Sequence, residues 1–288
     1  MPLDRRFGVA GATIGGMVRR ALLSFALAAC TRGEAAKHGA PPVDEGRATD
    51  VEPPPVAAPP AATSGPFYEP DPGGRPVAIL REDAPNIAFV GMEKGACEAE
   101  LQKRGVPFAK ATDTKGVLAP VWIRGPMRGV TFHAIGTTAE KSKSTLEIFD
   151  CRLVVALDEF ARELEKHDIV DVTFFSAFRA RAQGGCTPKY AGKQHCAALA
   201  VDVASFKKKS GAVLDVEKDF HGKIGSATCA GVAKPNPPSA NATELWQIVC
   251  DAARSATFHV ILTPNFNAQH KNHFHLELTP DAAWMLIK

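Results

Sequence analysis

Prolines divide this chain into two parts that cannot fold alike. Half of the 22 prolines lie between residues 41 and 76, and few apolar side chains accompany them apart from alanines, valines and the pair Phe67–Tyr68. Such a segment buries too little apolar surface to offset the entropy lost when a chain becomes ordered. We therefore expect residues 30–76 to form a disordered Pro/Ala-rich tether. Residues 77–288 are long enough to form one globular domain around a single core.

A short apolar run precedes the expected tether. Arg19 and Arg20 are followed by the sequence ALLSFALAA, which ends at Cys30. Spanning a bilayer takes about 20 apolar residues, so this run favours a cleaved export signal over residues 1–29. The alternative is a buried N-terminal helix that ends at a chance cysteine.

The end of the apolar run carries a second signal. Residues 27–30 read LAAC and resemble the lipobox of bacterial lipoproteins, in which the cysteine after the cleavage point carries lipid. The resemblance implies that a lipid on Cys30 anchors the chain to a membrane. Thr31 stands where lipoproteins kept at the inner membrane usually carry Asp, so we expect the periplasmic face of the outer membrane.

The remaining cysteines agree with export. Six of them follow Cys30, an even number, and none forms a Cys-x-x-Cys pair that would favour a zinc-thiolate or thioredoxin-like site. In an exported chain they predict up to three disulfides, although six cysteines allow 15 pairings and the sequence does not choose among them. The six are Cys97, Cys151, Cys186, Cys196, Cys229 and Cys250.

The charge balance excludes one class of partner. The chain has 34 Lys and Arg against 31 Asp and Glu, and the whole excess lies in the first 29 residues, where four arginines face one aspartate. The mature chain is therefore neutral and has no general electrostatic attraction for polyanions. We expect no nucleic-acid partner.

The periodicity of the globular part predicts an α+β fold. Residues 151–167 place apolar side chains at helical spacing with charged ones opposite, as expected for a helix that packs on a core. Several alternating or apolar runs indicate strands, and their order favours helices packed on a mainly antiparallel sheet. The further expected helices are 96–104 and 244–254, the latter capped by Thr243, and the expected strands are 169–175, 199–203, 213–216, 258–262 and 273–278.

Three separated positions suggest a metal site. His273 and His275 are alternate residues of an expected strand, so both imidazoles can face one side while Phe274 enters the core. Asp202 lies between two valines, an unusual place for a carboxylate unless it is paired or ligates a metal. Together with His195 they offer a His-Asp-His zinc set with an open fourth position. The alternative to a metal site is that His273 and His275 form a hydrogen-bonded structural pair and that Asp202 lies on the solvent-exposed face of a half-buried strand.

These residues lie in stretches that resemble a known family, the bacterial extensin-like C-terminal domain, which is related to zinc D-alanyl-D-alanine peptidases and murein endopeptidases. The resemblance runs from about Cys97 to Leu278. It rests on SAFRAR at residues 176–181, on HCAALAVD at residues 195–202, and most specifically on PNFNAQHKNHFHLE at residues 264–277. It implies a D-Ala-D-Ala peptidase-like fold.

The resemblance also implies roles for individual residues. His195, Asp202 and His275 become the zinc ligands, and His273 becomes a catalytic acid or base. Arg181 or Arg179 would polarise the scissile carbonyl or hold a substrate carboxylate, and the sequence does not decide between them. His270 is expected either to support the zinc ligands from behind or to shape the turn that precedes the histidine pair.

The chain departs from the family pattern around the expected zinc histidine. Lys193 replaces a serine, Ala198 replaces a glycine, Cys196 replaces an alanine, and Ala180 replaces a cysteine. Lys193 can alter substrate preference, and a bridge from Cys186 to Cys196 can staple the loop that carries His195.

We therefore expect a lipid-anchored envelope protein that uses zinc to hydrolyse peptide bonds in peptidoglycan stem peptides or cross-links. The alternative is a non-catalytic lipoprotein of the same fold that binds wall polymer or metal.

Overall fold

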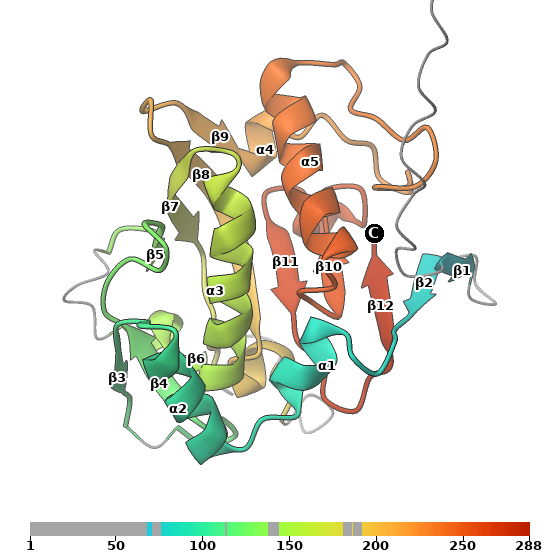
Figure 1. Cartoon of the computed structure of the whole chain (residues 1–288). Coiled ribbons are helices and arrows are strands. Elements are labelled where there is room, and N and C mark those ends of the chain that lie inside the picture. Colours follow the sequence, from blue (N-terminus) through green and yellow to red (C-terminus); the bar gives the residue numbers. More distant parts are fainter. Residues whose placement is uncertain (1–67, 71–75, 113, 138–143, 181–185, 187–191) are drawn as a thin grey trace, which may run out of the picture. The chain divides into compact units, whose positions relative to one another are not determined.

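The computed structural model describes residues 68–70, 76–112, 114–137, 144–180, 186 and 192–288 (Figure 1). The described residues lie within one compact unit that spans Pro59–Lys288. The expected signal, the lipidation candidate Cys30, most of the tether and Arg181 lie outside the described residues. Among the described residues, no helix has both the length and the apolar character needed to cross a bilayer.

A nine-stranded sheet forms the centre of the described fold, with β9 paired to β8 beside the main path. Its pairings are antiparallel except for two, β10 with β12 and β5 with β7, which confirms the expected α+β class. In spatial order the strands of the main path are β1 (Tyr68–Pro70), β2 (Pro76–Ile79), β12 (Trp284–Ile287), β10 (Val260–Leu262), β11 (Phe274–Glu277), β8 (Ala200–Lys208), β7 (Ile169–Phe174) and β5 (Thr131–Ala134); β9 is Val213–Asp215.

Helices cover one face of this sheet (Figure 1). The longest are α3 (Cys151–Glu165) and α5 (Ala240–Arg254), and shorter ones surround them: α1 (Pro85–Val90), α2 (Lys94–Lys103) and α4 (Val216–Asp219). A small second sheet joins β3 (Phe108–Lys110), β4 (Pro120–Ile123) and β6 (Phe149–Asp150). Three 3-10 turns complete the described elements: η1 (Thr145–Glu147), η3 (Gln194–Ala197) and η4 (Ala268–His270).

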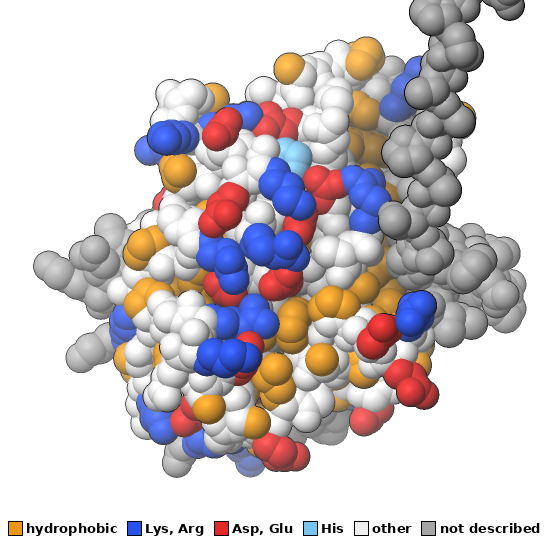
Figure 2. All heavy atoms as spheres, viewed as in Figure 1, with side chains coloured by type: hydrophobic (Ala, Val, Ile, Leu, Met, Phe, Trp, Pro, Cys, Tyr) orange, Lys and Arg blue, Asp and Glu red, His pale blue; other side chains and the backbone are white. Residues whose placement is uncertain are grey.

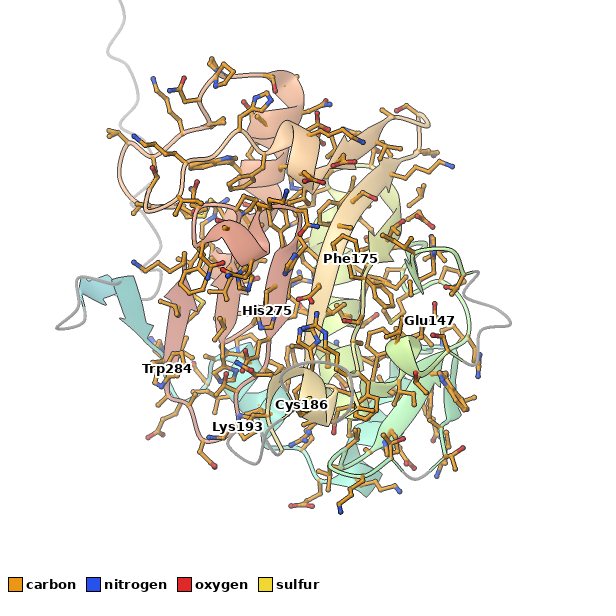
Figure 3. The ribbon with its side chains drawn as sticks, turned by 180° about the vertical axis from the view of Figure 1, so that it is seen from behind. Glu147, Phe175, Cys186, Lys193, His275 and Trp284 are labelled. Carbon is orange, nitrogen blue, oxygen red and sulfur yellow. A yellow bond between two sulfur atoms is a disulfide. The ribbon has the colours of Figure 1, made fainter. Side chains whose placement is uncertain are left out.

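A chain of aromatic rings forms the core between helices and sheet. Phe160 of α3 contacts Phe206 of β8, which contacts Phe274 of β11, and Phe274 contacts Phe220, which stacks on Trp246 of α5. Because Phe274 points to the helices, its two strand neighbours face the opposite side of the sheet. That opposite face is seen in Figure 3, where His275, Phe175 and Trp284 lie on it.

The elements that the sequence predicted are present within a few residues of their expected bounds, except that β8 extends to Lys208 and α5 begins earlier. The sequence did not predict α1, α4, β1 to β6 or β12, and β1 lies within the expected tether. Helix α5 begins at Ala240 rather than Glu244, because Ser239 and not Thr243 is its N-cap. The Ser239 hydroxyl accepts a hydrogen bond from the Ala242 amide at 3.0 Å, whereas the Thr243 hydroxyl donates to the Ser239 carbonyl. Both residue types favour caps, and only the three-dimensional path of the chain distinguishes them.

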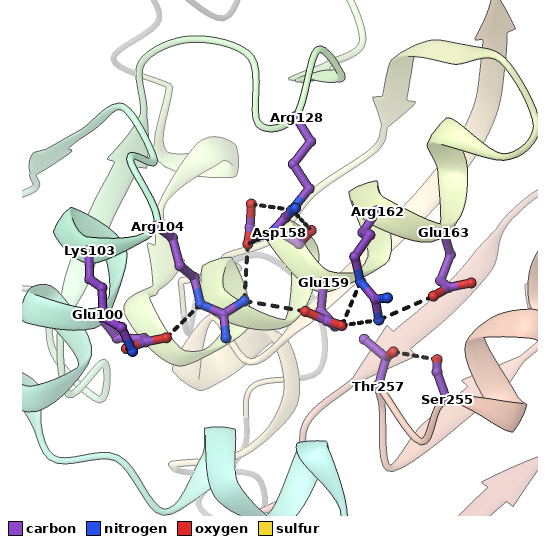
Figure 4. Close-up of polar contacts among 10 residues, drawn as sticks. All are labelled: Glu100, Lys103, Arg104, Arg128, Asp158, Glu159, Arg162, Glu163, Ser255 and Thr257. Carbon is purple, nitrogen blue, oxygen red and sulfur yellow. Dashed lines mark hydrogen bonds and ion pairs between the residues drawn. The ribbon is translucent and has the colours of Figure 1, made fainter.

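An ion-pair network ties α2 to the outer face of α3 (Figure 4). Asp158 is 2% exposed and accepts hydrogen bonds from Arg104 at 3.0 Å and from Arg128 at 3.1 Å. Arg104 also contacts Glu100 at 2.8 Å. The same face of the molecule shows Lys and Arg side chains interleaved with Asp and Glu (Figure 2).

Three disulfides join the six cysteines that the sequence offered. Cys97–Cys151 links α2 to α3, Cys186–Cys196 closes a loop before β8, and Cys229–Cys250 fastens the segment before α5 to that helix. The expectation of three disulfides is therefore confirmed, and the pairing, which the sequence left open, is now resolved. Disulfides of this kind indicate an extracytoplasmic protein.

Candidate metal centre

Strand register places two of the three expected ligands side by side. His275 of β11 is directly opposite Asp202 of β8 in an antiparallel pair. His275 lies on the face that the helices do not cover (Figure 3), and its cross-strand partner shares that face. His195 comes from η3, which immediately precedes β8. All three residues are at most 6% exposed. Their ligand atoms lie within 4.8 Å of one another.

The two imidazole rings approach the same carboxylate oxygen of Asp202. Oδ1 of Asp202 lies 3.1 Å from Nε2 of His195 and 3.0 Å from Nδ1 of His275. The two ring nitrogens are themselves 3.3 Å apart. Three potential donors to a metal therefore converge on one small volume.

Hydrogen bonds on the far side of each ring decide which nitrogen faces this volume. The Nδ1–H of His195 donates to the Ala177 carbonyl at 2.9 Å, and the Nε2–H of His275 donates to Oε2 of Glu277 at 3.0 Å. The Thr279 hydroxyl in turn donates to the other oxygen of Glu277 at 3.0 Å. In each ring the protonated nitrogen therefore points away from Asp202, and the unprotonated nitrogen faces Asp202 and the other ring. Because lone pairs then face one another, a cation between them would be stabilising.

The electrostatics of the group also favour a cation there. Burial opposes the charged form of Asp202, yet hydrogen bonds and charge from His195 and His275 lower the pKa of this carboxyl well below 3.8. Burial likewise opposes the charged form of His275, but hydrogen bonds to Asp202 and Glu277 raise its pKa to about 9. Without a metal, a proton on His275 supplies the positive charge that the two carboxylates require.

The donor set fits zinc. Two imidazole nitrogens and one carboxylate oxygen are borderline ligands of the kind found in zinc sites with three protein ligands, and carboxylate–histidine pairs orient such ligands. The residues that would hold the ion are His195, Asp202 and His275, and the buried carboxylate of Glu277 orients the last of them.

His273 lies beside the three ligands. Its Nδ1–H donates to Oδ1 of Asn272 at 2.9 Å, and its Nε2 lies 3.4 Å from Oδ1 of Asp202. The ring also meets Phe175 edge-on, with the centroids 5.9 Å apart. Burial lowers the pKa of His273. In the neutral imidazole Nε2 carries no proton, so this nitrogen, beside Asp202, can accept one.

His270 completes a cluster of rings around the site. Asn267 caps η4 and fixes this histidine, since its Oδ1 accepts from the His270 Nδ1–H at 2.7 Å. The His270 ring lies 5.0 Å from that of His273 and 5.8 Å from that of His275, centroid to centroid. Burial lowers its pKa to about 4. The ring is therefore neutral and lies beside the candidate ligands, and its supporting role stays a prediction.

Of the two candidate arginines, the structure describes only Arg179. Its guanidinium pairs with Oδ2 of Asp202 and donates to the Ser176 hydroxyl at 3.0 Å. Arg179 thus occupies the oxygen of Asp202 that does not face the histidines. Part of the guanidinium remains open, because the side chain is 35% exposed at the cavity.

With this geometry described, comparison with known proteins identifies the family. The model of the extensin-like protein C-terminus matches residues 95–286, about two thirds of the chain. The chain belongs to the extensin-like C-terminal family. No curated protein and no solved structure matches the chain.

The loop before β8 shows how this extensin-like chain accommodates its departures from the family pattern. Gln194 and Ala198, on either side of His195, have left-handed φ angles of 51° and 54°. Glycine adopts this conformation without cost, whereas Ala198 adopts it with its methyl group fully buried. The bridge Cys186–Cys196, one of the pairings that the sequence left open, is present, so a disulfide holds the residue next to His195.

The candidate metal centre opens into a cavity of about 790 Å³, a size typical of ligand sites. Besides the ligands, its lining includes two groups that the sequence analysis did not place there: Glu277, which binds His275, and an apolar wall from β10 and β12. The spacing of Glu277, two residues after His275 on one strand, was a usable signal. The wall was not predictable, because β12 was not expected as a strand.

Proposed function

We propose that the chain is an exported zinc hydrolase that cleaves peptide bonds in peptidoglycan stem peptides or cross-links. The observation that carries this proposal is the convergence of two imidazoles with fixed tautomers on the carboxylate of Asp202, in a cavity large enough for a peptide. A bound zinc ion would supply the Lewis acid that polarises a carbonyl and makes water a better nucleophile.

The residues around the ligands supply the remaining functions. In the proposed mechanism the neutral Nε2 of His273 accepts a proton from the attacking water and later returns it to the leaving amine. The bond from its Nδ1–H to Asn272 keeps the ring turned toward the cavity. Arg179 holds Asp202 in place, and its exposed N–H groups stabilise the negative charge that develops on the carbonyl oxygen. Arg181, which lies outside the described residues, remains a candidate for the same role.

Several features support peptidoglycan as the substrate. The motifs of the chain resemble those of zinc D-alanyl-D-alanine peptidases and murein endopeptidases, and from this resemblance we infer the same type of fold. The disulfides indicate a location outside the cytoplasm, where the wall lies. We propose further that lipid on Cys30 anchors the domain to the periplasmic face of the outer membrane, at the end of a tether that lets it reach the wall.

The test is a digestion of purified muropeptides by the zinc-loaded chain, analysed by mass spectrometry. We expect shortened or uncrosslinked products with wild type, none with His195→Ala, and a loss of rate of about 10²- to 10⁴-fold with His273→Gln, which keeps the ligands. Stoichiometric zinc without any digestion would instead identify the non-catalytic metal- or wall-binding module.

A further inference from the structure

An apolar surface begins one strand away from the metal ligands. On β10, Leu262 stands directly opposite His275, and Val260 stands directly opposite Glu277. Leu286 of β12 continues the row beyond Val260. Cross-strand neighbours lie about 5 Å apart at their Cβ atoms, so the row passes from ligand to aliphatic side chain within one residue spacing.

These side chains line the cavity rather than fill the core. The alternate residues of the same strands point to the helices, and Ile261, Met285 and Ile287 there are at most 1% exposed. On the cavity side, Trp284 keeps 38% of its surface exposed and lines the cavity together with its aliphatic neighbours. Figure 3 shows Trp284 on the same face as His275. The outward wall of β10 and β12 therefore consists of Val260, Leu262, Trp284 and Leu286, and Phe266 also lines the cavity.

The two carboxylates that line the cavity already have partners. Asp202 forms an ion pair with Arg179 and contacts His195 and His275. Glu277 accepts hydrogen bonds from His275 and Thr279. Lys193 lines the same cavity and is exposed, and no carboxylate pairs with its ammonium group among the residues that the structure describes. With a divalent ion on the three ligands, the cavity carries a net positive charge. It is therefore complementary to an anion.

We propose that the cavity binds a peptide with a free carboxylate and an aliphatic side chain, the carboxylate at Lys193 and the side chain on the wall around Trp284. This inference rests on the proposed function and specifies its substrate. Lys193 is the better partner for the carboxylate because the guanidinium of Arg179 already holds Asp202 and Ser176. Two separate contacts, one at Lys193 and one at the wall, fix the orientation of the peptide in the cavity, as productive binding of a scissile bond requires.

Equilibrium binding tests the two contacts independently of turnover. The probes are acetyl-Leu-Leu, its C-terminal amide, and acetyl-Gly-Gly, each in L and D forms, titrated into the zinc-loaded full chain. We expect wild type to bind the acid about fivefold more tightly than the amide, and less so at high salt. We expect it to bind the leucine peptide about tenfold more tightly than the glycine peptide.

The variants then separate the contacts. Lys193→Gln should bring the acid-to-amide ratio close to unity and keep the preference for leucine, whereas Lys207→Gln, a matched exposed lysine on β8 outside the cavity lining, should change neither. Trp284→Ala should weaken the leucine preference and keep the acid preference, and Trp284→Phe should restore it.

The outcomes distinguish this inference from the proposed function. An unchanged acid preference in Lys193→Gln, an unchanged leucine preference in Trp284→Ala, or no binding of any probe would overturn the inference, whatever the zinc content and the muropeptide digestion show. Absence of zinc from the wild-type chain would instead overturn the proposed function. The muropeptide digestion tests that function without using these probes.

Discussion

Nε2 of His275 lies 3.0 Å from Oε2 of Glu277, two residues farther along the same strand, and both side chains are buried. The period of the strand puts both on one face, so the carboxylate can reach the ring without any turn of the backbone. The bond fixes the ring nitrogen that faces Asp202 and raises its basicity toward a cation.

Glu277→Gln should therefore weaken zinc binding by about 10- to 100-fold, because an amide orients the imidazole less well and contributes no charge. Competition with a chromophoric chelator measures the affinity. Thr279→Val, which removes only the 3.0 Å bond to the other oxygen of Glu277, should have a smaller effect. Equal zinc affinity in wild type and Glu277→Gln would show that the carboxylate does not act on the metal.

Removal of either of two disulfides should lower stability, but only one of these changes should lower zinc affinity. Cys97–Cys151 closes a separation of 54 residues and Cys186–Cys196 one of 10. By loop entropy, replacing the first pair with alanine should cost about 4 kcal/mol of unfolding free energy and the second about 3 kcal/mol. Only the second should weaken zinc binding, because Cys196 adjoins His195. A drop in zinc affinity in the first variant alone would contradict this assignment.

Stability should fall in mild acid through a histidine outside the metal centre. His259 is fully buried: its Nε2–H donates to the Ala282 carbonyl at 3.2 Å and its Nδ1 accepts the Thr279 amide at 3.2 Å. Burial lowers its pKa from 6.5 to about 4. Between these values the unfolded chain binds the extra proton, so stability is full above pH 6.5 and decreases as the pH falls toward 4. The slope is at most about 1.4 kcal/mol per pH unit.

Chemical denaturation from pH 7 to pH 4 measures this effect as a difference between wild type and His259→Gln, whose amide can keep both hydrogen bonds. The variant should show the shallower slope. Identical slopes in the two proteins would rule out His259 as the source.

The ion-pair network on α3 should contribute unequally to stability. Asp158→Ala should cost about 3 kcal/mol, because it removes a buried carboxylate and leaves Arg104 and Arg128 without it. Arg162→Ala, on an arginine that is 47% exposed and belongs to the same network, should cost less than about 1 kcal/mol. Thermal unfolding of the two variants compares them, and similar losses would show that burial does not set the contribution.

Much of the candidate site could be predicted from sequence because strands impose simple rules. The alternation of His273, Phe274 and His275 fixed which rings share a face, and Asp202 between two valines identified a carboxylate in a strand interior. The structure brings His195, Asp202 and His275 together, although their roles stay predictions.

The rest depended on contacts between distant segments. The carbonyl of Ala177 that orients His195 comes from the other end of a loop, and no local pattern marks it. The pairing of Trp284–Ile287 beside β10 could not be foreseen, because a short apolar run near a chain end fits a strand no better than a loop. The true cap Ser239 differed from the expected Thr243 because serine and threonine both favour caps and the sequence alone does not choose between them.

The central claim is that His195, Asp202 and His275 hold one metal ion, and elemental analysis after equilibrium dialysis against zinc tests it most directly. We predict a single zinc ion per wild-type chain and only traces in His195→Ala and Asp202→Asn, with both variants folded by circular dichroism. Wild-type protein without zinc, or variants that retain as much zinc as wild type, would contradict the account.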